Sequence, residues 1–295
     1  MTRRKASAGL QDALGYLGEA GIRLWVRLTG RRLTRDDALW LRCPTGEAGR
    51  VGQEVYDLLA RREGLLVHRR PGAGLLEDFT ALAGPHFDPS SVHPAIRAFY
   101  ERTATYRMES WSEAGFLGRL PLWLLVTFVS RRMDQLNVPV SSLELAGGMR
   151  SEVLELLDAS SGKRRYTGWL RTMTATGRVI YAGLYTTERI PNWDGPCVKV
   201  SFPLPLGCVI GFLRPEAGPD GSFKLISSGT RFGDPGFYRI VERRDRTRQV
   251  RYVRPLREFF HVYVDREGIL RTDHTIRFLG INVLRMHYKI IPVGG

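Results

Sequence analysis

Hydrophobic residues recur at helical spacing in the first half of the chain. Residues 52–64 place apolar side chains three and four positions apart and end at a glycine, which predicts a helix. A second helix is expected over residues 93–107, where Pro94 suits the first helical position. A third, apolar on most sides, is expected over residues 117–137. The Gly- and Pro-rich residues 69–94 are typical of an irregular segment that runs over the surface.

The pattern changes near residue 138. From there, short runs of Val, Ile, Tyr, Phe and Thr alternate with turns that contain Gly, Asp or Pro. The turns are roughly 10 to 30 residues apart, which leaves no room for crossover helices and predicts about eight to ten antiparallel strands in chain order. A meander of that size can hide its edges by closing into a barrel.

Together these patterns predict an α+β protein with three parts. Residues 1–20 are expected to be a flexible basic tail, and residues 21–137 a helical and irregular N-terminal part. Residues 138–295 are expected to form an antiparallel meander β-barrel, whose inner and outer faces follow from the alternation along each strand.

Two neighbouring strands show this alternation. In residues 197–206, every second side chain is a large apolar one, and these are expected on one face. In residues 208–216, the alternate positions begin apolar and end at Arg214 and Glu216. Such a change is expected where a barrel interior opens to solvent, so Arg214 is a candidate ligand contact.

Residues 256–278 predict a hairpin with Gly268 in the left-handed position of a three-residue loop. In this register Phe260 lies opposite His274, on a face that is mostly apolar and should look inward. His274 and Glu258 are then diagonal neighbours on that face, within reach of each other's side chains.

Arg254 precedes Glu258 by four residues and is expected on the same side of the strand. The opposite face sets His261 against Asp273, which we expect to form a surface pair. A slip of one residue in the register would exchange the two faces.

The inward polar groups have two interpretations. In the functional one, His274 and Glu258 are catalytic and exchange protons with a bound molecule. The expected ligand-binding residues are Arg254, Arg214, Tyr288, Phe260 and Thr272. In the structural one, Arg254 and Glu258 form an ion pair and His274 is a satisfied core residue.

Metal and cofactor motifs are missing from the sequence. The six histidines include no HxxxH or HxH pair, which disfavours a metal site. There is no GxSxG nucleophile motif and no GxGxxG or GxxxxGK[ST] phosphate loop. We therefore expect no metal and no cofactor.

The chain is basic, with a formal net charge of +14. Of its 44 basic residues 39 are arginines, a bias that is also typical of GC-rich genomes, so no specific nucleic-acid partner is expected. The Arg-rich residues 239–257 predict a solvated face. The alternative interpretation is that these arginines, together with the apolar residues 120–130, form a weak peripheral contact with a membrane. The oligomeric state is open.

The cysteines and the N-terminus indicate a cytoplasmic protein. Cys43, Cys197 and Cys208 match neither a disulfide framework nor a metal site, so reduced thiols are expected. The first residues contain no apolar run of signal-peptide length. Residues 120–130 are about half as long as a membrane-spanning helix needs to be.

Three segments carry a resemblance to a family. "HPAIRAFYERTATYRMESWSE" (93–113), "RRMDQLNVPVSSLE" (131–144) and "RFGDPGFY" (231–238) resemble an uncharacterised group of proteins from GC-rich bacteria, over about residues 90–290. The group implies no activity and no catalytic residues. At fold level the predicted meander is similar to lipocalin-like barrels, which hold apolar small molecules, although a fold by itself does not decide a function.

The resulting hypothesis is that the protein holds a hydrophobic or amphipathic small molecule in the barrel. It would act on this molecule as a cofactor-independent acid/base enzyme, such as an isomerase or cyclase. The first alternative is a non-catalytic carrier or sensor of a lipid-like ligand. The second is a membrane or nucleic-acid contact through arginines.

Overall fold

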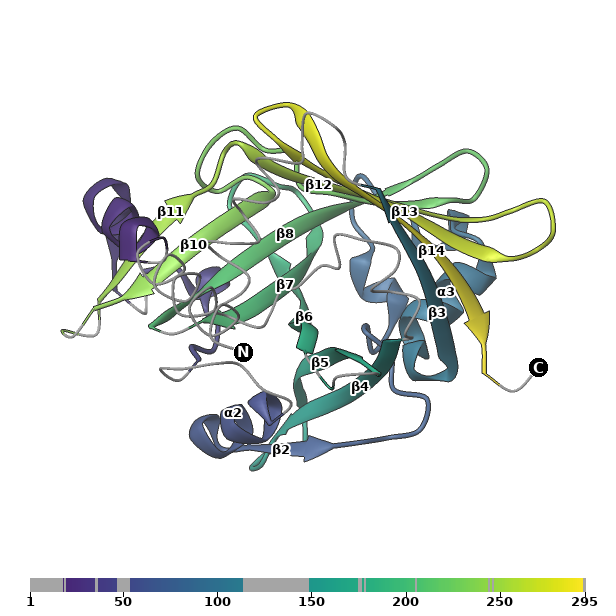
Figure 1. Ribbon diagram of the computed structural model, residues 1–295, viewed down its shortest axis with the longest axis horizontal. Coiled ribbons are helices and arrows are strands. Elements are labelled where there is room, and N and C mark those ends of the chain that lie inside the picture. The colour runs from purple at the N-terminus through teal and green to yellow at the C-terminus, as the bar shows by residue number, and fades with distance from the viewer. Residues whose placement is uncertain are drawn as a thin grey trace, which may run out of the picture.

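The computed structural model describes residues 18–113 and 149–293, with short breaks at residues 19, 35–36, 47–53, 175–176, 178, 205, 244 and 246. The helix predicted for residues 117–137 lies outside the described residues, as does most of the basic tail (1–20). In the described part, strands predominate and form one curved sheet (Figure 1).

Helices are few and short. They are residues 20–29, α2 (Val55–Glu63), α3 (Pro94–Glu101) and the 3-10 turns η1 (Leu39–Leu41), η2 (Phe79–Leu82), η3 (Pro89–Ser91) and η4 (Thr103–Thr105). As predicted, α2 stops at Gly64, whose φ of +67° lets its N–H reach the carbonyl of Ala60. Pro94 occupies the first turn of α3, also as predicted. This helix ends at Glu101, earlier than expected, because the chain enters a strand at Tyr106.

The sheet has 14 strands. They are β1 (Arg31–Leu33), β2 (Leu65–His68), β3 (Tyr106–Glu113), β4 (Met149–Asp158), β5 (Arg164–Met173), β6 (Val179–Arg189), β7 (Pro196–Leu204), β8 (Gly207–Ala217), β9 (Phe223–Ile226), β10 (Gly236–Glu242), β11 (Arg248–Tyr252), β12 (Leu256–Val264), β13 (Leu270–Phe278) and β14 (Ile281–Pro292). All pairings are antiparallel, as predicted. The part expected to be helical and irregular contributes β1, β2 and β3.

The predicted closed barrel is wrong for the described residues. The main path runs β2-β4-β5-β6-β7-β8-β9-β12-β13-β14-β3, and no described ladder joins β3 back to β4. A side branch leaves β8 through β10 and β11 to β1. The open sheet is nevertheless curled so that β3 and β4 lie close together. Apolar side chains from both ends of the path therefore pack in one cluster, whose side of the sheet we call the inner face.

Residues 69–94 cover one end of the inner face. They were expected to run over the surface, but their large apolar side chains are buried in the inner cluster with those of α3. Phe79 is fully buried, and its ring centroid lies 5.0 Å from that of Phe223 on β9. Burial of so many apolar side chains stabilises this irregular segment in place of regular hydrogen bonding.

The outer face carries two further apolar clusters. Tyr56 and Leu59 of α2 pack against β4, β5 and β6. The segment made of η1 and the residues just after it, here called the outer segment, packs Leu41 and Cys43 against β7, β8 and β10. Each strand in these regions is therefore buried on both sides, which explains the fully buried pattern of β7.

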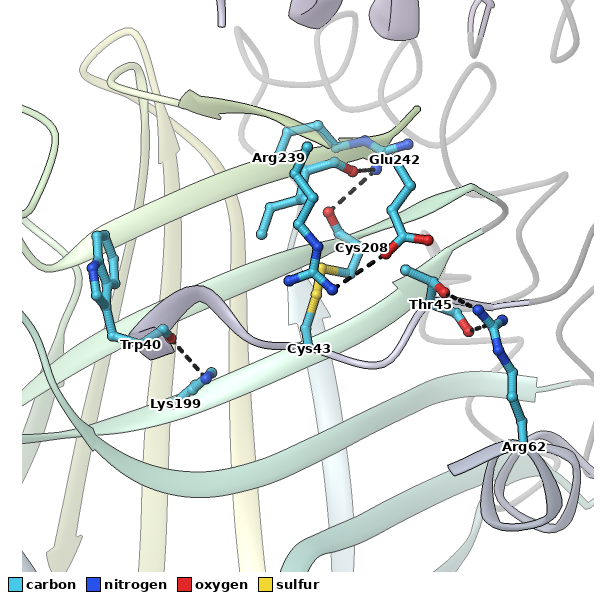
Figure 2. Close-up of a disulfide and its surroundings, with 10 residues drawn as sticks. Trp40, Cys43, Thr45, Arg62, Lys199, Cys208, Arg239 and Glu242 are labelled. Atoms are coloured by element: carbon cyan, nitrogen blue, oxygen red, sulfur yellow. Dashed lines mark hydrogen bonds and ion pairs between the residues drawn. A yellow bond between two sulfur atoms is a disulfide. The ribbon is translucent and has the colours of Figure 1, made fainter. Parts of the chain in front are cut away.

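A disulfide joins Cys43 to Cys208 on β8, across a sequence separation of 165 residues (Figure 2). The prediction of three reduced thiols is therefore wrong for this pair. Cys197 remains a free, buried thiol, and burial raises its pKa to about 12. The bond ties the outer segment to the centre of the sheet.

Lys199 on β7 is buried beneath the same segment. Its Nζ donates a hydrogen bond of 2.7 Å to the carbonyl oxygen of Trp40 and lies 3.5 Å from a carboxylate oxygen of Glu188 (Figure 2 shows the contact with Trp40). Burial lowers the pKa of Lys199 to about 8, although Glu188 acts in the opposite direction.

We expect this buried amine to make the free energy of unfolding vary with pH in the alkaline range. The folded pKa of about 8 lies below the ordinary value of 10.5, so between these values the unfolded state binds more protons and stability rises with pH. Relative to Lys199→Met, the wild type should gain up to about 3 kcal/mol between about pH 7 and pH 10. Urea unfolding of both proteins over this range measures the gain. A difference that does not change with pH would contradict the assignment.

Candidate functional site

Aromatic residues and one arginine meet on the inner face of β5 and β6. Alternation along β5 turns Trp169 and Arg171 inward, while Leu170 faces α2. On β6, Tyr181 and Tyr185 point inward in the same way. A Cβ at position 183, between these tyrosines, would lie 2.6 Å from the hydroxyl of Tyr181, so glycine is the residue that leaves room for that ring.

Arg171 lies among these rings. Its guanidinium carbon is 3.8 Å from the ring centroid of Trp169 and 5.2 Å from that of Tyr288 on β14, which identifies a cation–π arrangement. One terminal nitrogen donates to the sulfur of Met108 on β3 at 3.0 Å. Contacts from β5, β14 and β3 to one side chain follow from the curl of the sheet.

The charge of Arg171 is buried, and it lacks an acidic partner among the described residues. The residue is 8% exposed, and its Nε makes no hydrogen bond within the part of the chain that the structure describes. Among the described residues, no carboxylate forms an ion pair with it. An isolated buried cation is costly, so a second source of negative charge would stabilise this arrangement.

The tyrosines around Arg171 are held in their neutral form. The hydroxyl groups of Tyr181 and Tyr185 share a hydrogen bond of 2.6 Å. Burial raises the pKa of Tyr185 and of Tyr288, and the negative charge of Glu258 raises both further, whereas the positive charge of Arg171 lowers both. Arg171 and Glu258 therefore both lie near Tyr185 and Tyr288, and they shift the pKa of these tyrosines in opposite directions.

The predicted hairpin register is confirmed. Phe260 lies opposite His274 and Glu258 opposite Ile276, with Gly268 at a φ of +77° in the connecting turn. His274 is buried, its ring stacks on Phe260 at 3.8 Å between centroids, and its Nε2 lies 3.7 Å from a carboxylate oxygen of Glu258. That Nε2 has no hydrogen-bond partner in the described ranges. The inward placement of both predicted catalytic residues is confirmed, and their catalytic role stays a prediction.

The predicted ligand-binding residues divide into two groups. Thr272 and Tyr288 are buried partners on adjacent strands of the inner face, beside Phe260. Arg254 is exposed in the turn that precedes β12, because the strand begins only at Leu256, so its predicted place beside Glu258 is wrong.

Arg214 also lies away from the inner face. On β8 the inward position next to it is Leu213, which belongs to the inner cluster, so Arg214 points to the outer side. There it pairs with Glu216 at 3.0 Å and covers the ring of Trp193 at 5.3 Å. The interpretation of residues 208–216 as an opening of the interior is therefore wrong.

The outer side of the hairpin differs from its predicted contacts as well. His261 and Asp273 are opposite in the register, as predicted. The carboxylate of Asp273, however, bonds to Nδ1 of His287 at 2.6 Å, while the ring of His261 stacks on Tyr263. The Asp273 contact therefore crosses to the next strand, β14.

The Arg-rich residues 239–257 are not uniformly solvated, contrary to the prediction. Arg239 is buried, and its guanidinium donates to the carbonyl oxygens of Cys208 and Ile240. Arg248 is buried and pairs with Glu242 at 3.2 Å. These arginines stabilise the side branch of the sheet.

Sequence reasoning missed Arg171, Trp169, Tyr181 and Tyr185. A signal was present, because an arginine and a tryptophan share one face of the otherwise apolar run "GWLRTM" (168–173). Two tyrosines flank a glycine at the same spacing in the next strand. An isolated arginine at an inward position is the feature that distinguishes this pair of strands.

The arrangement can hold an anion at Arg171, and it can exchange a proton at His274. No group of three metal-ligating side chains occurs in the described ranges. Of the helices that the structure describes, none has the length and apolarity to cross a membrane.

Comparison of the chain with protein-family models, with curated proteins and with solved structures finds no match.

Proposed function

We propose that the protein binds an amphipathic small molecule with an acidic group, which lies at Arg171 on the inner face of the sheet. The observation that carries the proposal is the buried guanidinium without a carboxylate partner among the described residues. A bound carboxylate, sulfonate or phosphate would supply the missing charge through charge-assisted hydrogen bonds.

The surroundings of Arg171 favour a ligand with an apolar or aromatic body. Trp169, Tyr181 and Tyr288 offer ring faces, and Met108 offers a polarizable thioether. The linked hydroxyls of Tyr181 and Tyr185 add a polar contact in the same region. A few polar groups in an apolar lining are typical of small-molecule sites.

Anilinonaphthalene sulfonate, an aromatic anion whose fluorescence rises in apolar surroundings, tests the proposal. Arg171→Met should weaken its binding by about tenfold to a hundredfold, because a hydrogen bond to a charged group contributes about 1.5 to 3 kcal/mol. Fluorescence titration measures the dissociation constants.

Arg266→Met is the matched control, since Arg266 is exposed in the turn between β12 and β13. It should bind the probe as the wild type does. Equal affinities of the wild type and Arg171→Met would reject the proposed anion contact. Native mass spectrometry of protein purified from its own host would then identify the natural ligand.

A second candidate function is proton transfer to that ligand by His274 and Glu258. Nε2 of His274, which has no hydrogen-bond partner among the described residues, favours it, because a buried ring nitrogen normally has one. Neutral imidazole would accept a proton from the bound molecule, and the nearby carboxylate of Glu258 would stabilise the imidazolium that forms.

Isotope exchange separates this candidate from a non-catalytic carrier or sensor. When the wild type is incubated in deuterium oxide with the molecule that co-purifies, it should introduce deuterium at a carbon atom of that molecule. His274→Gln should retain binding and lose at least about a hundredfold in the exchange rate. Mass spectrometry of the recovered molecule provides the measurement. Exchange that survives in His274→Gln would remove His274 from the mechanism, and no exchange in the wild type would favour the carrier.

The cytoplasmic location stays a prediction, and the disulfide points in another direction. Disulfides form and persist mainly in oxidising compartments. We therefore propose that the chain folds where Cys43 and Cys208 can be oxidised. Alkylation of freshly lysed host cells, followed by mass spectrometry of the two cysteine-containing peptides, would show the state of the pair.

A further inference from the structure

The helix at residues 20–29 exposes large apolar side chains to solvent. Leu24 is 57% exposed, Trp25 41% and Leu28 76%. With 3.6 residues per turn, all three lie within about 100° of one another around the helix axis. Val26, which is fully buried, lies on the opposite side and attaches the helix to the protein.

The helix therefore packs one apolar side against the fold and exposes the other side to solvent. It lies beside β11 (the purple helix of Figure 1), and the guanidinium of Arg251 covers the ring of Trp25 at 5.4 Å and donates to the carbonyl of Thr29. These contacts fix the helix, so the outward side is a preformed surface. An exposed apolar group of this kind indicates an interaction site.

The charge around this surface selects the kind of partner. Residues 20–34 contain four arginines and no acidic residue. Of these, Arg27, Arg31 and Arg32 are exposed. Arg32 is partly compensated by Asp245 at 2.8 Å, whereas no ion pair of Arg27 occurs in the described ranges. The apolar surface is thus bordered by net positive charge.

We propose that the helix at residues 20–29 docks the protein on the surface of a membrane that contains anionic lipids. Leu24, Trp25 and Leu28 enter the interfacial region, and the arginines remain at the level of the phosphate groups. Tryptophan beside leucine, flanked by arginine, is the composition that interfacial helices use. The helix lies in the plane of the interface and does not cross the membrane.

Flotation with vesicles tests this surface. Vesicles of about two parts phosphatidylcholine to one part phosphatidylglycerol should bind the wild type, whereas phosphatidylcholine alone should bind it several-fold less, and added salt should release it. Leu28→Ser should lower the affinity by about tenfold or more, since a buried leucine contributes that much. Arg27→Ala should lower it about fivefold.

Two controls separate this proposal from folding and from the proposed ligand site. Leu66→Ser changes an exposed leucine on another part of the surface, in β2 (57% exposed), and should bind vesicles as the wild type does. Arg171→Met should do so as well, because the inner face takes no part in docking. Trp25 should report the contact directly, as a blue shift of fluorescence that Trp25→Phe abolishes.

Three outcomes would overturn the proposal. One is a Leu28→Ser protein that binds anionic vesicles as tightly as the wild type. Another is equal binding to neutral and anionic vesicles, which would remove the role of charge. The third is a wild type that fails to bind vesicles and instead binds a DNA duplex or self-associates through Leu28, which would assign the surface to a different partner.

Discussion

Replacing Cys43 and Cys208 together by alanine is expected to lower the free energy of unfolding by about 4 to 5 kcal/mol. The disulfide closes a loop with a sequence separation of 165 residues. Its removal enlarges the conformational entropy of the unfolded chain, and this entropy cost of folding grows with loop length. Urea unfolding under non-reducing conditions measures the loss.

Cys197→Ala is the control for this experiment, because Cys197 is the free thiol buried in the same outer cluster. It should cost only about 1 kcal/mol, the effect of a small core truncation. Dithiothreitol should destabilise the wild type and Cys197→Ala alike and leave the double variant unchanged. A double variant that is as stable as the oxidised wild type would show that the bond does not constrain the chain.

Replacing Glu155 by glutamine is expected to destabilise the protein by about 3 to 5 kcal/mol. Glu155 on β4 is buried, and its carboxylate accepts from Arg164 at 2.7 Å and from Arg70 at 2.8 Å. Arg164 is itself largely buried and also donates to the carbonyl of Gly74. The network therefore ties residues 69–94, which cover one end of the inner face, to β4 and β5. Glutamine leaves the buried Arg164 with only Glu77 as an ion-pair partner in the described ranges, and that exposed carboxylate lies 3.8 Å from Nε.

The same network makes stability sensitive to acid. Burial opposes ionisation of Glu155, but Arg70 and Arg164 outweigh it and lower the pKa of Glu155 below its ordinary value. Its stabilising contribution is therefore present above the ordinary pKa and is lost as the pH falls through the lowered one. Thermal unfolding between about pH 7 and pH 3 should show a smaller loss for Glu155→Gln than for the wild type.

Glu109→Gln provides the matched control, since Glu109 on β3 forms an exposed ion pair with Arg107 at 3.9 Å. Surface pairs contribute about 0 to 1 kcal/mol, so this change should have little effect. If the two variants are equally stable, the Glu155 network does not hold the segment in place.

Local patterns were sufficient for the parts of the fold that depend on neighbours in the chain. The register of β12 and β13 follows from the alternation of apolar residues and from Gly268 in the turn, both of which lie within about twenty residues. The end of α2 at Gly64 is equally local. His274 and Glu258 were placed on the inner face for this reason.

Other features depend on residues that are distant in the chain, and the alternation along one strand does not report them. The curl of the sheet brings β5 to β3 and β14, and only this makes Arg171 a buried cation among three rings. The pairing of Cys43 with Cys208 and the covering of one end by residues 69–94 have the same origin.

The sequence by itself therefore determined the strands, their antiparallel order over most of the second half and the inward side of the last hairpins, because a period of two and turn chemistry are properties of short segments. Tertiary structure alone decided that the sheet stays open, that Arg214 and Arg254 lie outside, and that Arg171 lies inside. These outcomes depend on where strands end and which faces meet after the chain has curled, and burial energy summed over the whole molecule selects them.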